Sequence, residues 1–333
     1  NSYDEEAIID NQQTDHNCMN CHSFRMHDPD DMLFHMRSTY GGTYVWTNGV
    51  LEKLDGKVSD AIQSLVYPYW HPSGDYVAFS TNQTKQMFHM KDKNRIEVFD
   101  MSSDVLVYDV KNHRVVTDSL LFSKQAFETF PSFSPDGKTL YFSSSVAQKM
   151  PIDYKKVKYN ICSISFDAET GRFGTQVDTL YSVEQTGKTG TFPRVSPDGK
   201  FLAFTEADYG NFTIWHKEAD LCLIDLKTKE IKSLDALNSL EAESYHAWSS
   251  NGRWLVFASR RDDGLYSRPY IAYIDEEGTP HKAFVVPQAS PDAYLDGLKS
   301  YNVPEFITGP VNLQRKAVVE MAKHGQAKKV TAQ

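Results

Sequence analysis

The sequence predicts an all-β protein, a β-propeller of five or six four-stranded blades. Three observations support this fold class: aromatic residues make up 13% of the chain, a hairpin with a turn of the Ser-Pro-Asp-Gly type recurs four times, and two further alternating apolar stretches follow each hairpin. A high content of Tyr and Phe favours strands over a helical bundle. Four strands per unit, repeated around an axis, are typical of propeller blades.

Each repeated hairpin begins with an aromatic residue and a short apolar strand. The copies are "YPYWHPSGDYVAFST" from Tyr67, "FPSFSPDGKTLYFSS" from Phe130, "FPRVSPDGKFLAFTE" from Phe192 and "YHAWSSNGRWLVFAS" from Tyr245. Their turn glycines are 63, 62 and 53 residues apart. Because Pro presets φ and Gly permits a positive φ, these turns predict β-hairpins. The outer strands of the blades are expected in four stretches: 105–116, 161–174, 221–232 and 270–283.

A degenerate fifth copy of the hairpin occupies residues 21–38. Cys21-His22-Ser23-Phe24 aligns with Phe130-Pro131-Ser132-Phe133, and "GTYVWTN" and "VLEKLD" would supply its outer strands. Residues 300–306, "SYNVPEF", would begin a further innermost strand. We therefore divide the chain into an N-terminal segment that helps to close the ring, the propeller and a helix-prone tail, over residues 1–20, 21–310 and 311–333.

The repeated hairpins, over about residues 20–290, resemble the TolB-type propeller repeat. This resemblance implies the fold and leaves the activity open. The stretch "DNQQTDHNCMNCHSF", joined to these repeats, is also similar to exported propeller proteins of Bacteroides-type bacteria that are described as cytochrome c-related or TolB-like. The similarity implies a periplasmic or cell-envelope location, with an export signal lying outside a chain that begins at Asn1.

Composition excludes several functions. The formal charge of −9 and pI near 5.7 argue against non-specific nucleic-acid binding. The sequence contains no run of about 18 apolar residues, so no membrane span is predicted. Peptidases with this type of propeller carry their catalytic triad in a separate domain, but no G-x-S-x-G motif and no residues for such a domain are present. We therefore do not expect a hydrolase.

The motif Cys18-Met19-Asn20-Cys21-His22 has the spacing of a covalent haem c site. Two thiols three residues apart can attach to the haem vinyl groups, and the next histidine then ligates the iron. The motif is expected on the propeller face that carries long loops, where sites usually occur. Among these loops, residues 81–103 offer a sixth iron ligand, with His89 preferred over Met90 or Met87.

Two arginines are candidates for contacts with the haem propionates. Arg260 and Arg261 lie in "SRRDDGLYSRP" on the expected site-side loop of the fifth blade. Arginine pairs bidentately with carboxylates, which gives these residues a role if haem is bound.

Other interpretations of the cysteines remain open. Cys18 and Cys21 would alternatively form a disulfide or redox pair, or a metal site that recruits His16, His27 or His35. Cys162 and Cys222 lie in alternating apolar stretches and are expected to be buried free thiols.

Three more side chains have expected positions. His35 is expected to pack inside the first blade, His71 to be solvated in a turn, and His246 to line the mouth of the channel.

Three functions follow from these observations. The first is an exported propeller with haem c, acting in electron transfer or as a redox-linked binding module. The second is a haem-free protein- or glycan-binding propeller of the cell envelope, with a Cys18–Cys21 disulfide. The third is an enzyme that acts at the channel mouth.

Overall fold

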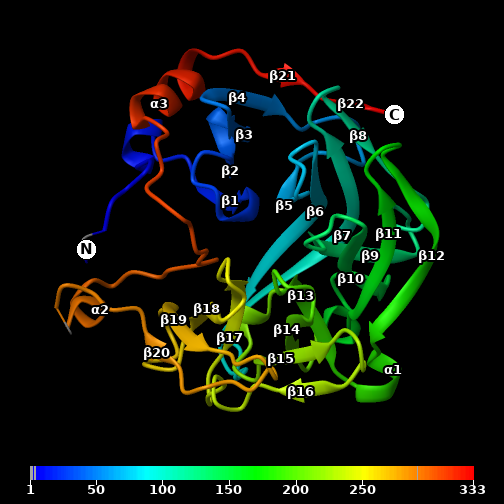
Figure 1. Ribbon diagram of the computed structural model, residues 1–333, viewed down its shortest axis with the longest axis vertical. Coiled ribbons are helices and arrows are strands. Elements are labelled where there is room, and N and C mark those ends of the chain that lie inside the picture. Colours follow the sequence, from blue (N-terminus) through cyan, green and yellow to red (C-terminus); the bar gives the residue numbers. More distant parts are fainter. Residues whose placement is uncertain (1–2, 4, 291) are drawn as a thin grey trace.

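The computed structural model describes residues 3, 5–290 and 292–333. Its strands form five sheets around a central axis, which confirms the β-propeller (Figure 1). In each sheet, four antiparallel strands follow one another in chain order from the axis outward. Blade 1 contains β1 (Met19–Phe24), β2 (Met32–Met36), β3 (Gly42–Thr47) and β4 (Val50–Asp55). Blade 2 contains β5 (Val66–Trp70), β6 (Tyr76–Phe88), β7 (Ile96–Asp109) and β8 (Arg114–Val116).

The other three blades have the same order of strands. Blade 3 contains β9 (Ala126–Phe133), β10 (Thr139–Val146), β11 (Asn160–Asp167) and β12 (Arg172–Tyr181). Blade 4 contains β13 (Thr189–Val195), β14 (Phe201–Ala207), β15 (Asp220–Asp225) and β16 (Ile231–Ser233). Blade 5 contains β17 (Glu243–Trp248), β18 (Trp254–Ser259), β19 (Arg268–Tyr273) and β20 (Phe284–Val285), so its last strand lies just beyond the predicted 270–283.

Side chains within the Ser-Pro-Asp-Gly turns hold the inner hairpins. In blade 3, Ser134 Oγ donates to Asp136 Oδ1 at 2.6 Å and accepts from the backbone N–H of Thr139 at 3.0 Å. Gly137 has φ +73°, which this turn requires and which other residues rarely adopt. The turn of blade 2 replaces the first serine with His71, which was predicted to be solvated. That prediction is wrong: His71 is buried, and its Nε2 lies 3.1 Å from the carbonyl oxygen of Gly137 in the next blade.

The innermost strands share a bulge that turns one side chain of each toward the axis. The residue at this bulge has a positive φ in every blade, and the pairing register shifts beside it. The five residues are Cys21 (+54°), Tyr67 (+51°), Phe130 (+52°), Phe192 (+58°) and Tyr245 (+52°). The structure therefore confirms the alignment of residues 21–38 with the other hairpins.

Apolar side chains pack each blade against the next. The first such cluster joins Leu33 and Val45 of blade 1 to Val77 and Phe79 of blade 2. Similar clusters join the later neighbours as far as blade 5. His35 is buried within blade 1, as predicted.

A sector without a sheet separates blade 5 from blade 1. Residues 300–306 form no strand, although Val303 has φ +49° and precedes a proline, as Tyr67, Phe130 and Phe192 do. The segment bridges the two blades: the backbone N–H of Tyr301 donates to Ser267 O at 2.8 Å, and that of Thr308 donates to His27 O at 2.9 Å. It thus resembles an innermost strand whose three outer strands are missing, and the propeller has five blades.

The tail and the N-terminal segment cover the open side of blade 1. The alternation in β2 turns Phe34 away from blade 2, where it packs with Val318 and Ala322 of α3 (Arg315–His324). Helix α3 lies within the tail that the sequence predicts to be helix-prone from residue 311. Asp15 of the N-terminal segment lies 3.3 Å from Lys323 on the same helix. Residues 1, 2 and 4 of that segment lie outside the described residues.

The last residues of the chain extend two sheets. β21 (Lys328–Lys329) pairs in parallel with β4, and β22 (Thr331–Ala332) pairs in parallel with β8. The remaining elements are short: α1 (Val183–Thr186), α2 (Ala293–Asp296) and 3₁₀ turns at Asn11–Thr14, Arg25–His27, Ser38–Tyr40, Tyr154–Lys156 and Thr213–Trp215. None of the described helices is long and apolar enough to cross a membrane.

Candidate functional site

Aromatic rings fill the middle of the central channel. The ring centroids of Tyr67 and Phe130 are 4.8 Å apart, those of Phe130 and Phe192 are 5.4 Å apart, and those of Phe192 and Tyr245 are 5.2 Å apart. Phe212, from the loop that follows β14, packs on the same group. We call these five residues the aromatic plug. They separate the two ends of the channel.

The hairpin of β6 and β7 covers the end of the channel that carries the long loops. Its strands pair as far as Phe88 and Ile96 and cross the ring toward blade 4 (Figure 1). There, buried Glu97 accepts hydrogen bonds from Tyr209 at 2.7 Å and lies 3.0 Å from Nε2 of His216. The prediction of a loop over residues 81–103 is therefore wrong. The alternation of apolar residues that signals a half-buried strand is missing from "TNQTKQMF", because most of this extension is exposed.

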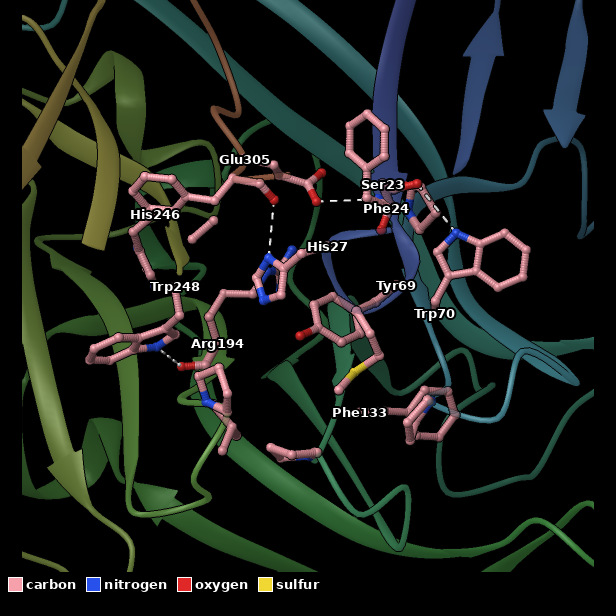
Figure 2. Close-up of a pocket in the computed structure, with 18 of the residues that line it drawn as sticks. Ser23, Phe24, His27, Tyr69, Trp70, Phe133, Arg194, His246, Trp248 and Glu305 are labelled. Atoms are coloured by element: carbon pink, nitrogen blue, oxygen red, sulfur yellow. Dashed lines mark hydrogen bonds between the residues drawn. The ribbon is translucent and has the colours of Figure 1, made fainter. Parts of the chain in front are cut away.

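A pocket opens at the opposite end of the channel, where the hairpin turns lie. It is a narrow, partly enclosed space that opens to solvent. Its apolar wall includes Phe24, Tyr69, Trp70, Phe133, Trp248 and Phe306. We call this space the channel pocket; Figure 2 shows its labelled side chains converging from several blades and from the 300–306 segment.

Arg194 of β13 is the main positive charge in the channel pocket. Its side chain is buried, and its guanidinium carbon lies 3.9 Å from the ring centroid of Phe192 and 4.9 Å from that of Tyr69. Nη1 donates to Pro193 O at 2.8 Å. Among the described residues, no carboxylate lies within 4.0 Å of the guanidinium. Burial lowers the pKa of Arg194 to about 10, so the group stays charged near neutral pH.

Glu305 lies across the channel pocket and is largely buried. One carboxylate oxygen accepts from the backbone N–H of Phe24 at 3.2 Å, and the other is 3.5 Å from His22 Nε2. Burial raises the pKa of this carboxyl, and the neighbouring His22 opposes the rise. His27 also faces the pocket, with Nδ1 3.0 Å from Phe306 O (Figure 2).

His246 lines the channel pocket, as predicted for the channel mouth. Its ring is fully buried, and burial lowers its pKa to about 3, so it is neutral. Two tryptophans are fixed beside these polar groups: Trp70 Nε1 donates to Ser23 O at 3.3 Å, and Trp248 Nε1 donates to Arg194 O at 3.0 Å. Rigid apolar walls with a few convergent polar groups are characteristic of small-molecule sites.

The residues of the haem motif do not converge on one space. Cys18 is exposed, Cys21 occupies the bulge position level with the aromatic plug, and His22 points into the channel pocket. The Cys21 thiol lies against the backbone of Tyr67, and burial raises its pKa to about 11. A covalent haem needs both thioethers and the imidazole around one macrocycle. As arranged here, with the plug filling the channel, the three residues do not fit that group.

All four cysteines are free, so the predicted alternative of a Cys18–Cys21 disulfide is not supported. Cys162 and Cys222 are buried in β11 and β15, as expected. Within the described part of the chain, no cluster of three or more His, Cys, Asp or Glu side chains is arranged to hold a metal ion. A metal site formed by the cysteines with His16, His27 or His35 is therefore not formed either.

The predicted sixth ligands lie at the other end of the channel from His22. His89 stacks on Tyr154 with ring centroids 6.2 Å apart, and its Nε2 is 3.3 Å from the Tyr154 hydroxyl. Met90 is 89% exposed at the tip of the hairpin, and Met87 is half-buried on β6. The structure does not bring His22 and His89 together.

The two predicted arginines have different surroundings. Arg261 is held by blade 5: its Nη2 lies 3.2 Å from buried Glu243, and its Nε donates to Ser259 Oγ at 2.8 Å. Arg260 stacks on Trp215 and has no such carboxylate partner in the part of the chain that the structure describes. Sequence reasoning missed Arg194 and Glu305. The available signal was their place in the repeat: Arg194 follows Phe192 by two positions, where Ser132 and Ala247 stand in other copies, and Glu305 follows Val303 by two positions in the strand-like segment.

Solved structures with the same architecture are similar to the chain. TolB from Acinetobacter baumannii matches with a TM-score of 0.50 and 15% identity, over 87% of this chain and 57% of that protein. The chain has the fold of a TolB-type β-propeller. A hypothetical selenium-binding protein from Sulfolobus tokodaii matches with a TM-score of 0.50 and 9% identity, over 77% of this chain and 64% of that one.

A prolyl endopeptidase matches with a TM-score of 0.50 and 14% identity, over 82% of this chain and 37% of the peptidase. The chain thus spans less than two thirds of the length of these three proteins. At such identities the likeness concerns the fold alone. No protein-family model matches the sequence, and no curated protein matches it either.

Proposed function

We propose that the protein is a binding propeller of the periplasm or cell envelope, and that its channel pocket takes a small organic carboxylate with an apolar or aromatic body. The observation that carries this proposal is Arg194, a buried cation that has no carboxylate within 4.0 Å among the described residues and only the more distant charge of Glu305 across the pocket. A charge removed from water is costly unless it is paired, and a guanidinium matches a carboxylate bidentately. A bound carboxylate would supply the missing partner.

The surroundings of Arg194 suit the rest of such a ligand. Trp70, Trp248 and Phe133 offer flat apolar surfaces, and the two indole N–H groups are already satisfied by backbone oxygens. Glu305 and His22 lie on the opposite side and would bind a hydroxyl or amino group. The residues that would hold the ligand come from rigid strands and from the bridging segment, which favours a preformed site.

The test is isothermal calorimetry with 3-phenylpropionate and its uncharged analogue 3-phenylpropanamide. We expect saturable binding of the acid and binding of the amide at least about 10-fold weaker. Arg194→Gln should weaken binding of the acid by about 30-fold or more, because removing one partner of a buried charge pair costs about 2–5 kcal/mol. Arg172→Gln, which changes an exposed arginine on β12, is the matched control.

Folding of the Arg194→Gln variant is checked by circular dichroism, and Arg194→Lys, which keeps the charge, provides a second variant. Removing an unpaired buried charge should not unfold the protein. If the wild type binds neither compound, or binds the acid and the amide equally, the proposal fails.

Covalent haem is the second candidate and rests on the sequence Cys18-Met19-Asn20-Cys21-His22. When bound, haem would supply electron-transfer chemistry, with Cys18, Cys21 and His22 holding it. Such attachment would require β1 to be rebuilt so that Cys21 leaves its place beside the aromatic plug. A pyridine haemochrome spectrum of the chain, exported together with haem c maturation machinery, decides between the candidates, with Cys18→Ala/Cys21→Ala as control. A c-type spectrum that is absent from the control would establish haem; a colourless protein would exclude it.

A further inference from the structure

A second pocket lies on the loop side of the propeller, between the tip of the β6–β7 hairpin and the loops of blades 4 and 5. It holds about 1260 Å³ of space, part of it open to solvent. We call it the hairpin-tip pocket. The aromatic plug separates it from the channel pocket, and the two have no lining residue in common.

Positive charge dominates the lining of the hairpin-tip pocket, although the whole chain carries a formal charge of −9. Five cations line it: Lys91, Lys93, Arg95, Lys217 and Arg260. The three carboxylates of the lining each already bind a cation: Asp92 binds Lys155 at 2.6 Å, Glu241 binds Lys217 at 2.5 Å and Asp263 binds Arg268 at 2.9 Å. Lys93 is likewise paired, with Asp208 and Glu218.

Three cations of this pocket therefore have no carboxylate partner among the described residues. Two of them, Lys91 and Arg95, are exposed at the hairpin tip, and Arg95 donates only to the backbone oxygen of Met90. The third, Arg260, is only 9% exposed. Surface lysines alone would be unremarkable, so the buried arginine is the informative residue.

Arg260 lies flat on an aromatic ring and keeps an unsatisfied donor. Its guanidinium carbon is 4.0 Å from the ring centroid of Trp215, and its Nε is buried without a hydrogen-bond partner. Burial lowers the pKa of Arg260, and the more distant carboxylates of Asp263 and Glu241 oppose this effect. Buried charged donors in proteins are normally paired, and an exception calls for a ligand or another explanation.

The neighbouring arginines differ from Arg260 in having carboxylate partners, although the Nε of Arg268, like that of Arg260, is buried without a hydrogen-bond partner. Arg261 binds Glu243, and Arg268 binds both Asp262 at 2.8 Å and Asp263 at 2.9 Å. Arg260, in the same loop, lines the hairpin-tip pocket and has no carboxylate partner among the described residues. Stacking on Trp215 holds the guanidinium of Arg260 in one orientation, so the side chain has little conformational entropy left to lose on binding.

We propose that the hairpin-tip pocket is a second binding site, which takes a small, multiply charged oxyanion through Arg260, Lys91 and Arg95. Carboxylate and phosphate groups share the chemistry that these cations recognise. Several negative charges are favoured because three unpaired cations face one space. The proposal does not depend on the ligand of the channel pocket.

The experiment is calorimetric titration of the full chain with two probes, citrate and glucose 6-phosphate. We expect at least one of them to bind saturably; the stronger probe identifies carboxylate or phosphate as the group recognised. Arg260→Gln should weaken the binding of that probe at least 10-fold, and Arg260→Lys should weaken it less. Arg172→Gln, an exposed control, should leave it unchanged.

Two further variants make the result specific. Lys91 is exposed, so Lys91→Gln should not disturb the core. This variant should weaken binding of the same probe several-fold, which tests the site even if Arg260→Gln folds poorly. Arg194→Gln should leave the binding of that probe unchanged, which distinguishes this site from the channel pocket. The proposal is overturned if neither probe binds, if Arg260→Gln and Lys91→Gln bind as the wild type does, or if Arg194→Gln alone removes binding.

Discussion

Glu128 of β9 should make the stability of this propeller depend on pH. Its side chain is buried; one carboxyl oxygen accepts from Ser144 Oγ at 3.2 Å and the other has no partner among the described residues. Burial, helped by the nearby Asp104, raises the pKa of Glu128 to about 8, from 4.5 in the unfolded chain. Between these values the folded state holds a proton that the unfolded state has lost. The contribution of Glu128 to stability is therefore complete below pH 4.5 and is lost as the pH rises toward 8.

The size of the decline follows from the difference between the two pKa values. A difference of about 3.5 corresponds to a free energy of unfolding that is about 5 kcal/mol lower above pH 8 than below pH 4.5. Glu128→Gln keeps the shape but cannot ionise, so the variant should lose most of this decline. Its buried amide would still have an unsatisfied atom, at a cost of about 1–3 kcal/mol that does not vary with pH. The slope against pH is therefore the quantity to measure.

Urea unfolding at several pH values between 5 and 8.5 measures that slope for the wild type and Glu128→Gln. The exposed Glu169→Gln, in a turn of the same blade, is the control and should follow the wild type. Parallel curves for the wild type and Glu128→Gln would refute the argument, because Glu128 would then be ionised in the folded protein near neutral pH.

Three other predictions concern the plug, the thiols and the tail. Phe130→Ala should lower the free energy of unfolding in urea by about 3–5 kcal/mol, since it empties the centre of the aromatic plug, and a loss below about 1 kcal/mol would contradict this packing. Iodoacetamide at pH 8 should modify exposed Cys18 well before Cys21, as read by peptide mass spectrometry; equal rates would contradict the position of Cys21. Deleting residues 327–333 removes β21, β22 and buried Val330, and should cost about 2 kcal/mol in the same urea assay; an unchanged midpoint would show that these strands add nothing.

Much of the fold could be predicted because the repeat reports local chemistry. The Ser-Pro-Asp-Gly turn is held by hydrogen bonds between neighbouring residues, so each copy predicts a hairpin independently of the rest of the chain. The alignment of Cys21 with Phe130 succeeded for the same reason, since both occupy the bulge of an innermost strand. His71 was misjudged because its hydrogen bond is made to a different blade, 66 residues away.

The candidate sites were harder to predict because they join distant parts of the chain. Arg194 and Glu305 come from β13 and from the bridging segment, and nothing near either residue in the sequence points to the other. Arg260 and Arg261 were selected together from the sequence, which could not show that Arg261 is paired with Glu243 while Arg260 stacks on Trp215. Motif spacing also does not report the directions of the side chains: the haem pattern lies in a bulged strand that sends Cys21 and His22 to different surroundings.

The bridging segment and the tail determine when the ring is completed during synthesis. Blades 2 to 5 pack against neighbours made just before them, so each can assemble as it emerges. Blade 1 is made before the other blades. Its Phe34 stays uncovered until α3 has been made, and β4 stays unpaired on its outer side until β21 has been made. A nascent chain therefore keeps an unfinished seam until α3 and β21 have been made, and a chain without them would expose that seam to association with other chains.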